Sequence, residues 1–326
     1  MNKLIYFFLA VFIILSFNLF AESIDGDYRY FFGTSIGFLS GKTEEIVYID
    51  GVSGDKLSQL DWEFKNVLLA GFDLVFDWQS NKSAFGFFYK FDFKFGITGF
   101  PFTNGVMEDR DWVDTSGKGE YYTYPDWLNL YSEHENKTNA VFLADFSAGV
   151  KVRLKSASIL KVFLSYNFMN YYWEAFGGSH LYPPETLDRH GYWPSSQKVI
   201  TYSQSWHMLS PGVSYYGEFN SLFNIELFFK CSPFIWLSSI DNHIGKNTVY
   251  IDKPKGGLFL EPGLVFSFNS GKNTSLSFTY SYKKITGSRG ESGYSKNGNP
   301  VVEIGNMAGA AFTSHEVGLL LKFRLL

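Results

Sequence analysis

Large apolar and polar residues alternate along this chain at every second position, over stretches longer than the strands of most soluble proteins. In residues 85–98 every odd position up to Phe95 is aromatic, whereas the even positions include Lys90, Asp92 and Lys94. Successive side chains of a β-strand point to opposite faces, so this period predicts one long strand with an aromatic face and a polar face. Strands of soluble proteins usually have about 5–6 residues. The alternation therefore constrains the fold strongly.

Further segments repeat the alternation. They are residues 62–78, 223–229, 276–282 and 319–325. In the first of them we expect Trp62, Phe64 and Leu74 to share the apolar face. Long strands with charges on one face and aromatic residues on the other are typical of an all-β, transmembrane, antiparallel up-and-down β-barrel with a polar interior. A soluble β-sandwich is the alternative, but aromatic residues make up 20% of the chain and would overfill the space between two sheets.

The first 21 residues have the pattern of a secretory signal peptide, which is removed from the mature protein. Lys3 precedes an apolar run over residues 4–15, and the small residue Ala21 follows. An uncleaved membrane anchor is the alternative, but the run is short for a spanning helix of about 20 residues. We therefore expect a signal peptide at 1–21 and a single barrel domain at 22–326, outside the cytoplasm.

The charge of the expected mature chain is mildly negative. Removing Lys3 leaves 28 − 1 = 27 basic residues against 32 acidic ones, so the net charge changes from −4 to 27 − 32 = −5. No basic stripe favours nucleic acid as a partner. The single cysteine, Cys231, has no partner for a disulfide within the chain, and we expect it to pack as a small apolar residue.

Short and long connections alternate between the expected strands. Four are tight turns near residues 79–82, 155–158, 218–221 and 269–273, and five are long and polar, at 40–60, 99–139, 174–198, 237–256 and 286–310. Four turns and five loops join ten strands, and outer-membrane barrels keep their long loops at the cell-surface end. The motifs Asp109-Arg110-Asp111-Trp112 and Asp241-Asn242-His243 fall in two of the long stretches. We therefore expect both motifs at the same end of the barrel.

These two motifs supply enough chemistry to activate a water molecule. His243 can take a proton from water near neutral pH, and Asp241 can hold its ring in one tautomer. Asp109 and Asp111 at close quarters repel each other, so one of them can retain a proton. A divalent cation on the three carboxylates and the histidine is an alternative, although no second histidine stands at ligand spacing. A serine nucleophile has less support, because no Gly-x-Ser-x-Gly occurs.

Six short segments, spread from the first expected strand to the last long loop, match one pattern. They are residues 39–45 (LSGKTEE), 58–62 (SQLDW), 109–112 (DRDW), 177–179 (GGS), 241–243 (DNH) and 294–298 (YSKNG). In this order they resemble the omptins, a family of outer-membrane aspartate/histidine endoproteases. Each segment alone is a weak signal, but six in register cover nearly the whole mature chain. The resemblance implies a ten-stranded barrel with a proteolytic groove at its outer rim.

The resemblance also implies a role for each residue of the two motifs. It makes Asp109 and Asp111 the catalytic aspartate pair. It makes Asp241 and His243 the facing dyad, with a water between pair and dyad that attacks a peptide carbonyl without a covalent intermediate. It implies no metal.

Substrate preference is implied by a further acid. Glu45 matches a position that receives a basic substrate side chain in omptins, and a carboxylate buried beneath a groove selects Arg or Lys because a cation offsets its desolvation. The alternative is a solvated loop glutamate. The family's second specificity acid, two residues before the dyad aspartate, is Ser239 here, so we expect a weaker or broader preference for basic residues.

The lipid-binding positions implied by the resemblance have changed. Omptins bind lipopolysaccharide through a Glu and Arg residues on the outer face of the barrel, and these positions are Phe168, Asn170 and Ser205 here, although Tyr166 is kept. Loss of Arg removes a bidentate contact to phosphate. We therefore expect contact with outer-membrane lipid but no dependence on lipopolysaccharide, and no other cofactor.

The expected function is that of a surface endopeptidase in the bacterial outer membrane. It would work as a monomer, face the exterior and cleave exposed polypeptides at or beside basic residues. A proteolytically inactive barrel that acts as an adhesin or host-protein receptor is the alternative. A diffusion pore is a second one, but a narrow lumen filled by side chains such as Lys90, Asp92, Lys94 and Glu226 disfavours it.

Overall fold

The computed structural model describes residues 26–49, 56–97, 104–112, 130–155, 157–181, 190–271 and 273–325. Within these ranges the chain forms thirteen strands and one short 3-10 helix. The elements are β1 (Gly26–Tyr48), β2 (Lys56–Ser80), β3 (Phe85–Ile97), β4 (Asn104–Asp111), β5 (Leu130–Lys155), β6 (Ser158–Leu181), β7 (His190–Glu218), β8 (Phe223–Ser232), β9 (Phe234–His243), η1 (Ile244–Lys246), β10 (Thr248–Lys255), β11 (Leu258–Asn269), β12 (Thr274–Lys296) and β13 (Val302–Arg324). No helix in these ranges is long and apolar enough to cross a membrane. The expected signal peptide lies outside the described residues.

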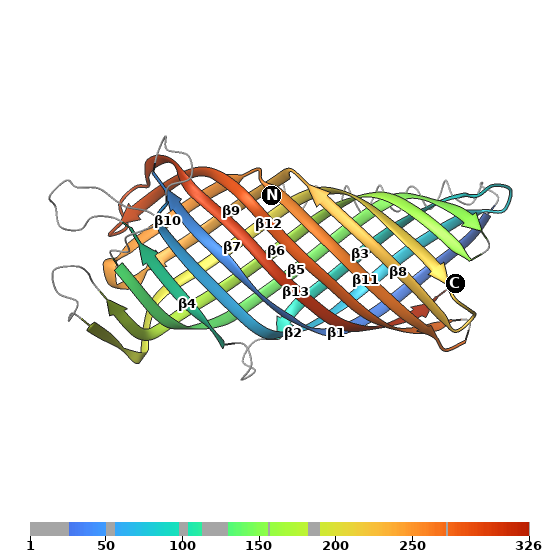
Figure 1. The fold of residues 1–326 in the computed structure, drawn as a ribbon, viewed down its shortest axis with the longest axis horizontal. Helices are drawn as coiled ribbons and strands as arrows, with labels where there is room; N and C mark the ends of the chain where they lie inside the picture. The colour runs from blue at the N-terminus through green and yellow to red at the C-terminus, as the bar shows by residue number, and fades with distance from the viewer. Residues whose placement is uncertain are drawn as a thin grey trace.

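The strands close into a barrel, which Figure 1 shows from the side. β1 pairs with β13, and the pairings of β10 with β12 and of β7 with β8 complete the ring. Three barrel strands are each interrupted once: β4 takes the place of β3 between β2 and β5, β9 follows β8 after Pro233, and β11 follows β10 after Gly256 and Gly257. Pro233 has no N–H for the ladder, and both glycines have positive φ. The barrel therefore has 13 − 3 = 10 strands, as predicted.

The two ends of the barrel differ as the connection lengths predict. The four tight turns join β2 to β3, β5 to β6, β7 to β8 and β11 to β12 at one end. At the other end the predicted long loops are too long, because the strands run far into the polar stretches. The described connection between β9 and β10, for example, spans only residues 244–247. Both acidic motifs consequently lie on strands β4 and β9 and not in loops, which corrects the sequence-based prediction.

The outer face of the barrel is apolar over the part nearest the tight turns. Its exposed apolar side chains include Ile36, Phe38, Leu74, Val162, Leu164, Leu227, Phe229, Phe278, Leu319 and Leu321. Toward the other end charged residues such as Lys65, Lys253 and Lys255 are exposed instead. An apolar band on a closed barrel identifies the membrane-spanning part. The end that carries β4, β9 and β10 therefore stands clear of the membrane.

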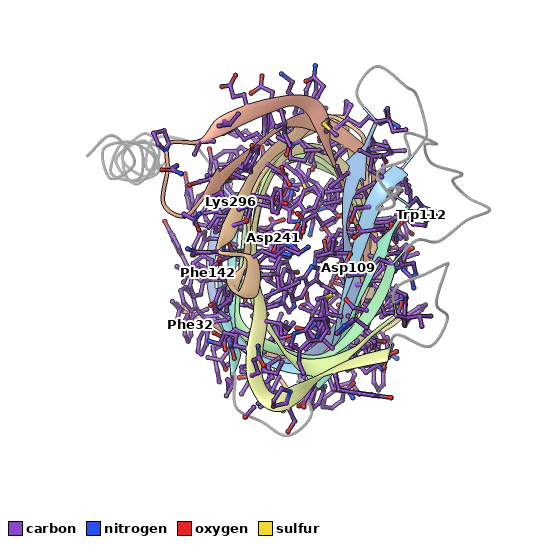
Figure 2. The ribbon with its side chains drawn as sticks, turned by 90° about the vertical axis from the view of Figure 1, so that its left-hand side faces the viewer. Phe32, Asp109, Trp112, Phe142, Asp241 and Lys296 are labelled. Atoms are coloured by element: carbon purple, nitrogen blue, oxygen red, sulfur yellow. The ribbon has the colours of Figure 1, made fainter. Side chains whose placement is uncertain are left out.

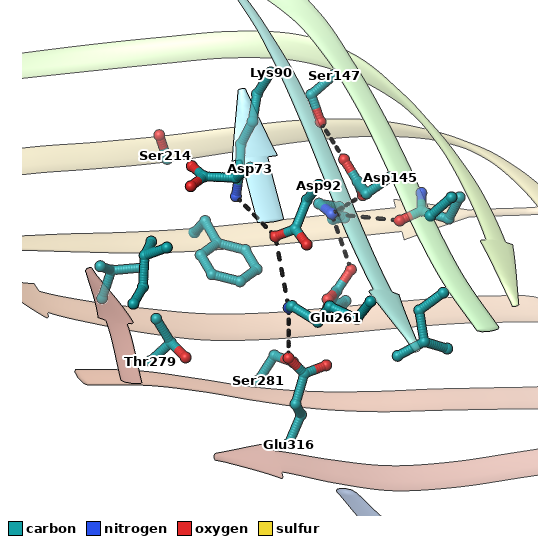
Figure 3. A pocket seen from close by; sticks show the side chains of 18 of the residues that line it. Asp73, Lys90, Asp92, Asp145, Ser147, Ser214, Glu261, Thr279, Ser281 and Glu316 are labelled. Carbon is teal, nitrogen blue, oxygen red and sulfur yellow. Dashed lines mark hydrogen bonds and ion pairs between the residues drawn. The ribbon is translucent and has the colours of Figure 1, made fainter. Parts of the chain in front are cut away.

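Inside the membrane-spanning part, a cavity of about 220 Å³ is lined by lysines and carboxylates that form ion pairs (Figure 3). Lys94 contacts Glu316 at 2.5 Å, and Lys283 bridges Glu316 at 3.1 Å and Glu261 at 3.4 Å. Lys90, Asp92 and Glu226 also line the cavity, so the predicted polar interior is confirmed. These paired charges occupy the lumen, which argues against a wide pore.

An aromatic layer fills the barrel above this network. Its fully buried members are Trp62, Phe64, Tyr171, Trp173, Tyr202, Trp206 and Phe312. Trp62 stacks on Tyr202 with ring centroids 5.2 Å apart, and Phe64 stacks on Phe312 at 5.9 Å. Rings packed in this way form a tightly packed apolar floor.

The position of Trp62 and Phe64 corrects the prediction that they share an outer face with Leu74. A register shift between β1 and β2 places one extra residue near Asn66, whose φ is 49° and whose N–H donates to Ser40 Oγ at 2.8 Å. A β-bulge of one residue shifts the alternation by one, so side chains at even positions before it face the opposite way from those at even positions after it. Trp62 and Phe64 therefore point inward, whereas Leu74 points outward.

Candidate active site

The alternation of β9 directs Asp241 into the open end of the barrel. Its neighbours in register are Tyr202 on β7 and Tyr250 on β10, and its side chain is only 2% exposed. Asp241 Oδ2 lies 2.6 Å from His243 Nε2, and the Tyr250 ring meets the imidazole edge-on at 5.4 Å. One ring nitrogen of His243 is thus held by the carboxylate, which leaves the other for a water molecule.

The pKa of His243 is raised above its ordinary value. Burial acts to lower it, but the charge and hydrogen bond of Asp241 outweigh burial. Asp109 also contributes to the increase, and Lys246 of η1 opposes it. A more basic imidazole is a better proton acceptor near neutral pH.

Asp109 and Asp111 lie on β4, which is held between β2 and β5. Residues two apart on a strand share a face, so both carboxyl groups are on the same side. Arg110 instead binds Asp61 of β2, with Nη1 2.8 Å from Oδ2. This ion pair attaches β4 to its neighbour and orients the strand. In this motif Arg110 therefore holds the strand in place, and Asp109 and Asp111 present two carboxyl groups on one side of it.

Burial is the main reason that the pKa values of both aspartates are raised. Repulsion from Asp111 adds to it for Asp109, whose pKa reaches about 7, although His243 and Lys246 act in the opposite direction. A hydrogen bond from Ser58 moderates the increase for Asp111. Two close, buried carboxyl groups cannot both ionise easily, so near neutral pH the pair holds a proton.

The pair and the dyad face each other across the end of the barrel. Figure 2 looks into this end and shows Asp109 and Asp241 on opposite walls. The mutual influence of Asp109 and His243 on their pKa values places them within electrostatic range. The structure therefore brings together all four residues that the two sequence motifs supplied. Lys246 also acts on Asp109 and His243, and the sequence analysis missed it because it belongs to neither motif.

Glu45 lies on β1 beside this group, next to Ala310 of β13. It is 3% exposed, which contradicts the alternative of a solvated loop glutamate. Burial raises its pKa well above the ordinary value, and the charges of Asp241, Asp252 and Asp109 add to the increase. Ser239 of β9 is also buried. Asp252 of β10 is a second acid here that the sequence analysis did not single out.

A buried serine and histidine stand behind Asp109 and were also missed. Ser132 of β5 is the register partner of Asp109, and its Oγ lies 3.0 Å from His134 Nε2. His134 Nδ1 contacts the carbonyl of Gly177, which can only accept, so Nδ1 carries the hydrogen and Nε2 accepts from Ser132. Burial lowers the pKa of His134. Both ring nitrogens of neutral His134 are thus engaged in structural hydrogen bonds.

The described residues offer no ready metal site. No group of three or more His, Cys, Asp or Glu in the described ranges has an arrangement that could hold a metal ion. The acids of the site instead interact with His243, Lys246 and one another.

The four positions implied for lipid binding form a neutral patch on the outer face. Asn170 Nδ2 donates to Ser205 Oγ at 2.8 Å, and Tyr166 Oη lies 2.6 Å from His207 Nδ1. The Phe168 ring packs on His207 with centroids 4.9 Å apart. These side chains bind one another and present neither a carboxylate nor a guanidinium.

Comparison with known proteins settles the family of this barrel. The model of the omptin family matches residues 28–325, which is most of the chain. This chain belongs to the omptin family. It is 26% identical over 301 residues to the plasminogen activator of Yersinia pestis, covering 89% of this chain and 88% of that protein. It is 28% identical over 281 residues to protease 7 of Escherichia coli O157:H7, covering 81% and 83%.

The fold of this omptin agrees with a solved structure. The crystal structure of the outer membrane protease OmpT from Escherichia coli superposes with a TM-score of 0.80 at 22% identity, over 91% of this chain and 97% of that one. The comparison supports the barrel architecture from β1 to β13.

Proposed function

We propose that this omptin hydrolyses exposed polypeptides with a water activated between Asp241–His243 and the Asp109/Asp111 pair. The relatives named as outer membrane proteases, and the family itself, make the chain a protease of the outer membrane. The Asp241–His243 hydrogen bond, facing a protonated aspartate pair at the end outside the apolar band, is the observation that carries the mechanism. This end faces the exterior.

The proposed reaction begins with proton transfer from water to His243. The water oxygen forms a bond to the carbonyl carbon of the peptide while the imidazole accepts the proton and Asp241 stabilises its positive charge. The carbonyl oxygen becomes an oxyanion, and the aspartate pair transfers its proton to this oxygen.

Collapse of this intermediate completes the hydrolysis. The C–N bond breaks, the imidazolium gives its proton to the leaving amine, the hydroxyl formed from the oxyanion returns its proton to the aspartate pair, and a new carboxyl end forms. No covalent bond to the protein is needed at any step.

Glu45 supports a preference for basic substrates. Its carboxyl group is buried in a strongly acidic surrounding and has no lysine or arginine partner among the ion pairs of the described residues. A guanidinium or ammonium group from a substrate offsets this charge, whereas an apolar side chain does not.

The experiment is cleavage of peptides containing Arg-Arg or Arg-Lys by the refolded full-length barrel. We expect Asp109→Ala and His243→Ala each to lower kcat/KM by at least about 100-fold, the usual contribution of a general acid or base. Ser132→Ala tests the serine alternative and should retain most activity. Unfolding of each variant is monitored so that loss of the barrel is not mistaken for loss of catalysis.

Two results would contradict the proposal. Equal cleavage by wild type, Asp109→Ala and His243→Ala would exclude the proposed machinery. Binding of host proteins without any cleavage would instead favour the inactive adhesin or receptor.

A further inference from the structure

A second carboxyl group lies against Glu45 although it comes from a distant strand. Asp252 of β10 is 5% exposed, and its carboxyl group is close enough to Glu45 of β1 for each to alter the pKa of the other. β12 and β13 separate these strands in the ring. The residues next to the two acids on these strands are small: Ser292 of β12 is the register partner of Asp252, and Ala310 of β13 is that of Glu45.

Asp252 also faces the position where the sequence lacks an acid. Asp252 and Ser239 are register partners on β10 and β9, and both side chains are buried. Residues directly opposite on an antiparallel pair have their side chains close together on one face. A carboxylate on β10 therefore occupies nearly the same place as one at position 239. The Ser239 hydroxyl meanwhile hydrogen-bonds to Tyr202 in the aromatic layer.

Each acid has one oxygen atom without a partner, although Ser292 of β12, the register partner of Asp252, contributes a hydrogen bond to it. Glu45 Oε2 and Asp252 Oδ1 are buried oxygens with no hydrogen-bond partner in the described residues, and so is Asp241 Oδ1. Among the ion pairs of the described ranges, no lysine or arginine contacts Glu45 or Asp252. A buried carboxyl pair without a cation costs free energy, and that cost is recovered when a cation binds.

We propose that Asp252 is a specificity-determining residue that receives, together with Glu45, the guanidinium or ammonium group of the substrate's basic side chain. The inference rests on the proposed protease function and extends it. Asp252 supplies from β10 the carboxylate that Ser239 does not supply from β9. The preference for basic residues is then strong, and not weakened as the serine at 239 alone predicts.

Binding of a basic side chain should also displace a proton. Two close, buried carboxyl groups cannot both ionise easily, so one of the two retains a proton. Burial raises the pKa of Asp252 to about 6, with Ser292 and Glu45 opposing the increase and the charge of Asp241 adding to it. Burial also raises the pKa of Glu45 well above its ordinary value. A cation that takes the place of this proton binds more tightly as pH rises. KM for a basic peptide should therefore fall with rising pH, while KM for a neutral analogue should not.

The test compares two peptides that differ only in the side chain at the cleavage position. One carries arginine and the other citrulline, which has the same shape without the charge. In wild type we expect kcat/KM to favour arginine strongly. In Asp252→Asn this ratio should fall by about tenfold or more, a change that corresponds to losing one charge-assisted contact. Glu291→Gln is the matched control, because Glu291 is an exposed acid on neighbouring β12.

A swap variant separates specificity from structural support. Ser239→Asp combined with Asp252→Ser moves the carboxylate back across the strand pair and should restore the arginine preference. An unchanged ratio in Asp252→Asn would overturn the inference, and so would an equal loss for both peptides. Selectivity that depends on Glu45→Gln but not on Asp252→Asn would overturn it while leaving the proposed function intact. No cleavage of either peptide by wild type would overturn both.

Discussion

Asp109 and Asp241 are both buried aspartates, yet their neighbours suit them to opposite tasks. Asp241 contacts the imidazole of His243 and favours its charged form. Asp109 instead has Asp111 beside it, and burial and repulsion raise its pKa to about 7. In the proposed mechanism one carboxylate therefore stabilises a positive charge, and the other carries a proton to the substrate. Two groups with environments that separate their proton affinities are what acid-base catalysis needs.

This difference predicts a bell-shaped pH dependence of kcat/KM. In the proposed mechanism activity requires neutral His243, so it should rise as pH increases through the raised pKa of the imidazole. It also requires protonated Asp109, so it should fall again as pH increases above about 7. Rates measured between about pH 5 and pH 9 check both arms.

Asp109→Asn isolates the falling arm. The amide donates hydrogen bonds at every pH, so kcat/KM should be lower but should no longer decline on the alkaline side. A decline that persists in Asp109→Asn would assign the alkaline arm to another group.

At the scale of the strands, the bulge in β2 decides which side chains build the floor of the site. Without the extra residue, Trp62 and Phe64 would stay on the lipid-facing side with Leu74. With it, they join the aromatic layer beneath Asp241 and Glu45. Asn66 is suited to the bulge because asparagine tolerates positive φ better than most residues.

The effect of substituting Asn66 on the stability of the barrel should therefore depend on backbone freedom and not on side-chain size alone. Asn66→Gly keeps access to positive φ and should leave stability nearly unchanged. Asn66→Ile should lower the free energy of unfolding by about 1–3 kcal/mol, because β-branched residues disfavour this conformation. Denaturant unfolding of the refolded barrel measures both. Equal stability of the two variants would show that the bulge does not need this conformation.

At the scale of the whole molecule, the neutral outer patch distinguishes this barrel from what the family resemblance implies. Phe168, Asn170 and Ser205 supply no charged group for a phosphate; Asn170 donates to Ser205, and the Phe168 ring packs on His207, which hydrogen-bonds to Tyr166. The active site is instead supported from below by the aromatic layer and the ion pairs around the cavity.

We propose accordingly that activity does not depend on lipopolysaccharide. Protein refolded without this lipid should cleave peptides at a rate that changes by less than about threefold when the lipid is added. The double variant Asn170→Arg/Ser205→Arg supplies two guanidinium groups and should gain lipopolysaccharide binding that the wild type lacks. Activity that appears only after the lipid is added would contradict the proposal.

Much of this molecule is encoded in local patterns. Period-two alternation predicts the strands, the spacing of tight turns predicts ten of them, and two motifs name four residues of the site. These signals are readable from the sequence because each depends on residues that are close together along the chain. The resemblance to the omptins then adds Glu45.

The features of the site that the sequence did not predict depend on how distant strands meet. The direction in which Trp62 and Phe64 point follows from a single bulge that shifts the register of β1 and β2. The meeting of Glu45 with Asp252 depends on closure of the ring, which brings together residues 207 positions apart, since 252 − 45 = 207. Sequence alone thus determined the barrel and the two acidic motifs of the candidate site. Only the tertiary structure decided which acids share a site, because strand register and ring closure are long-range properties of the chain.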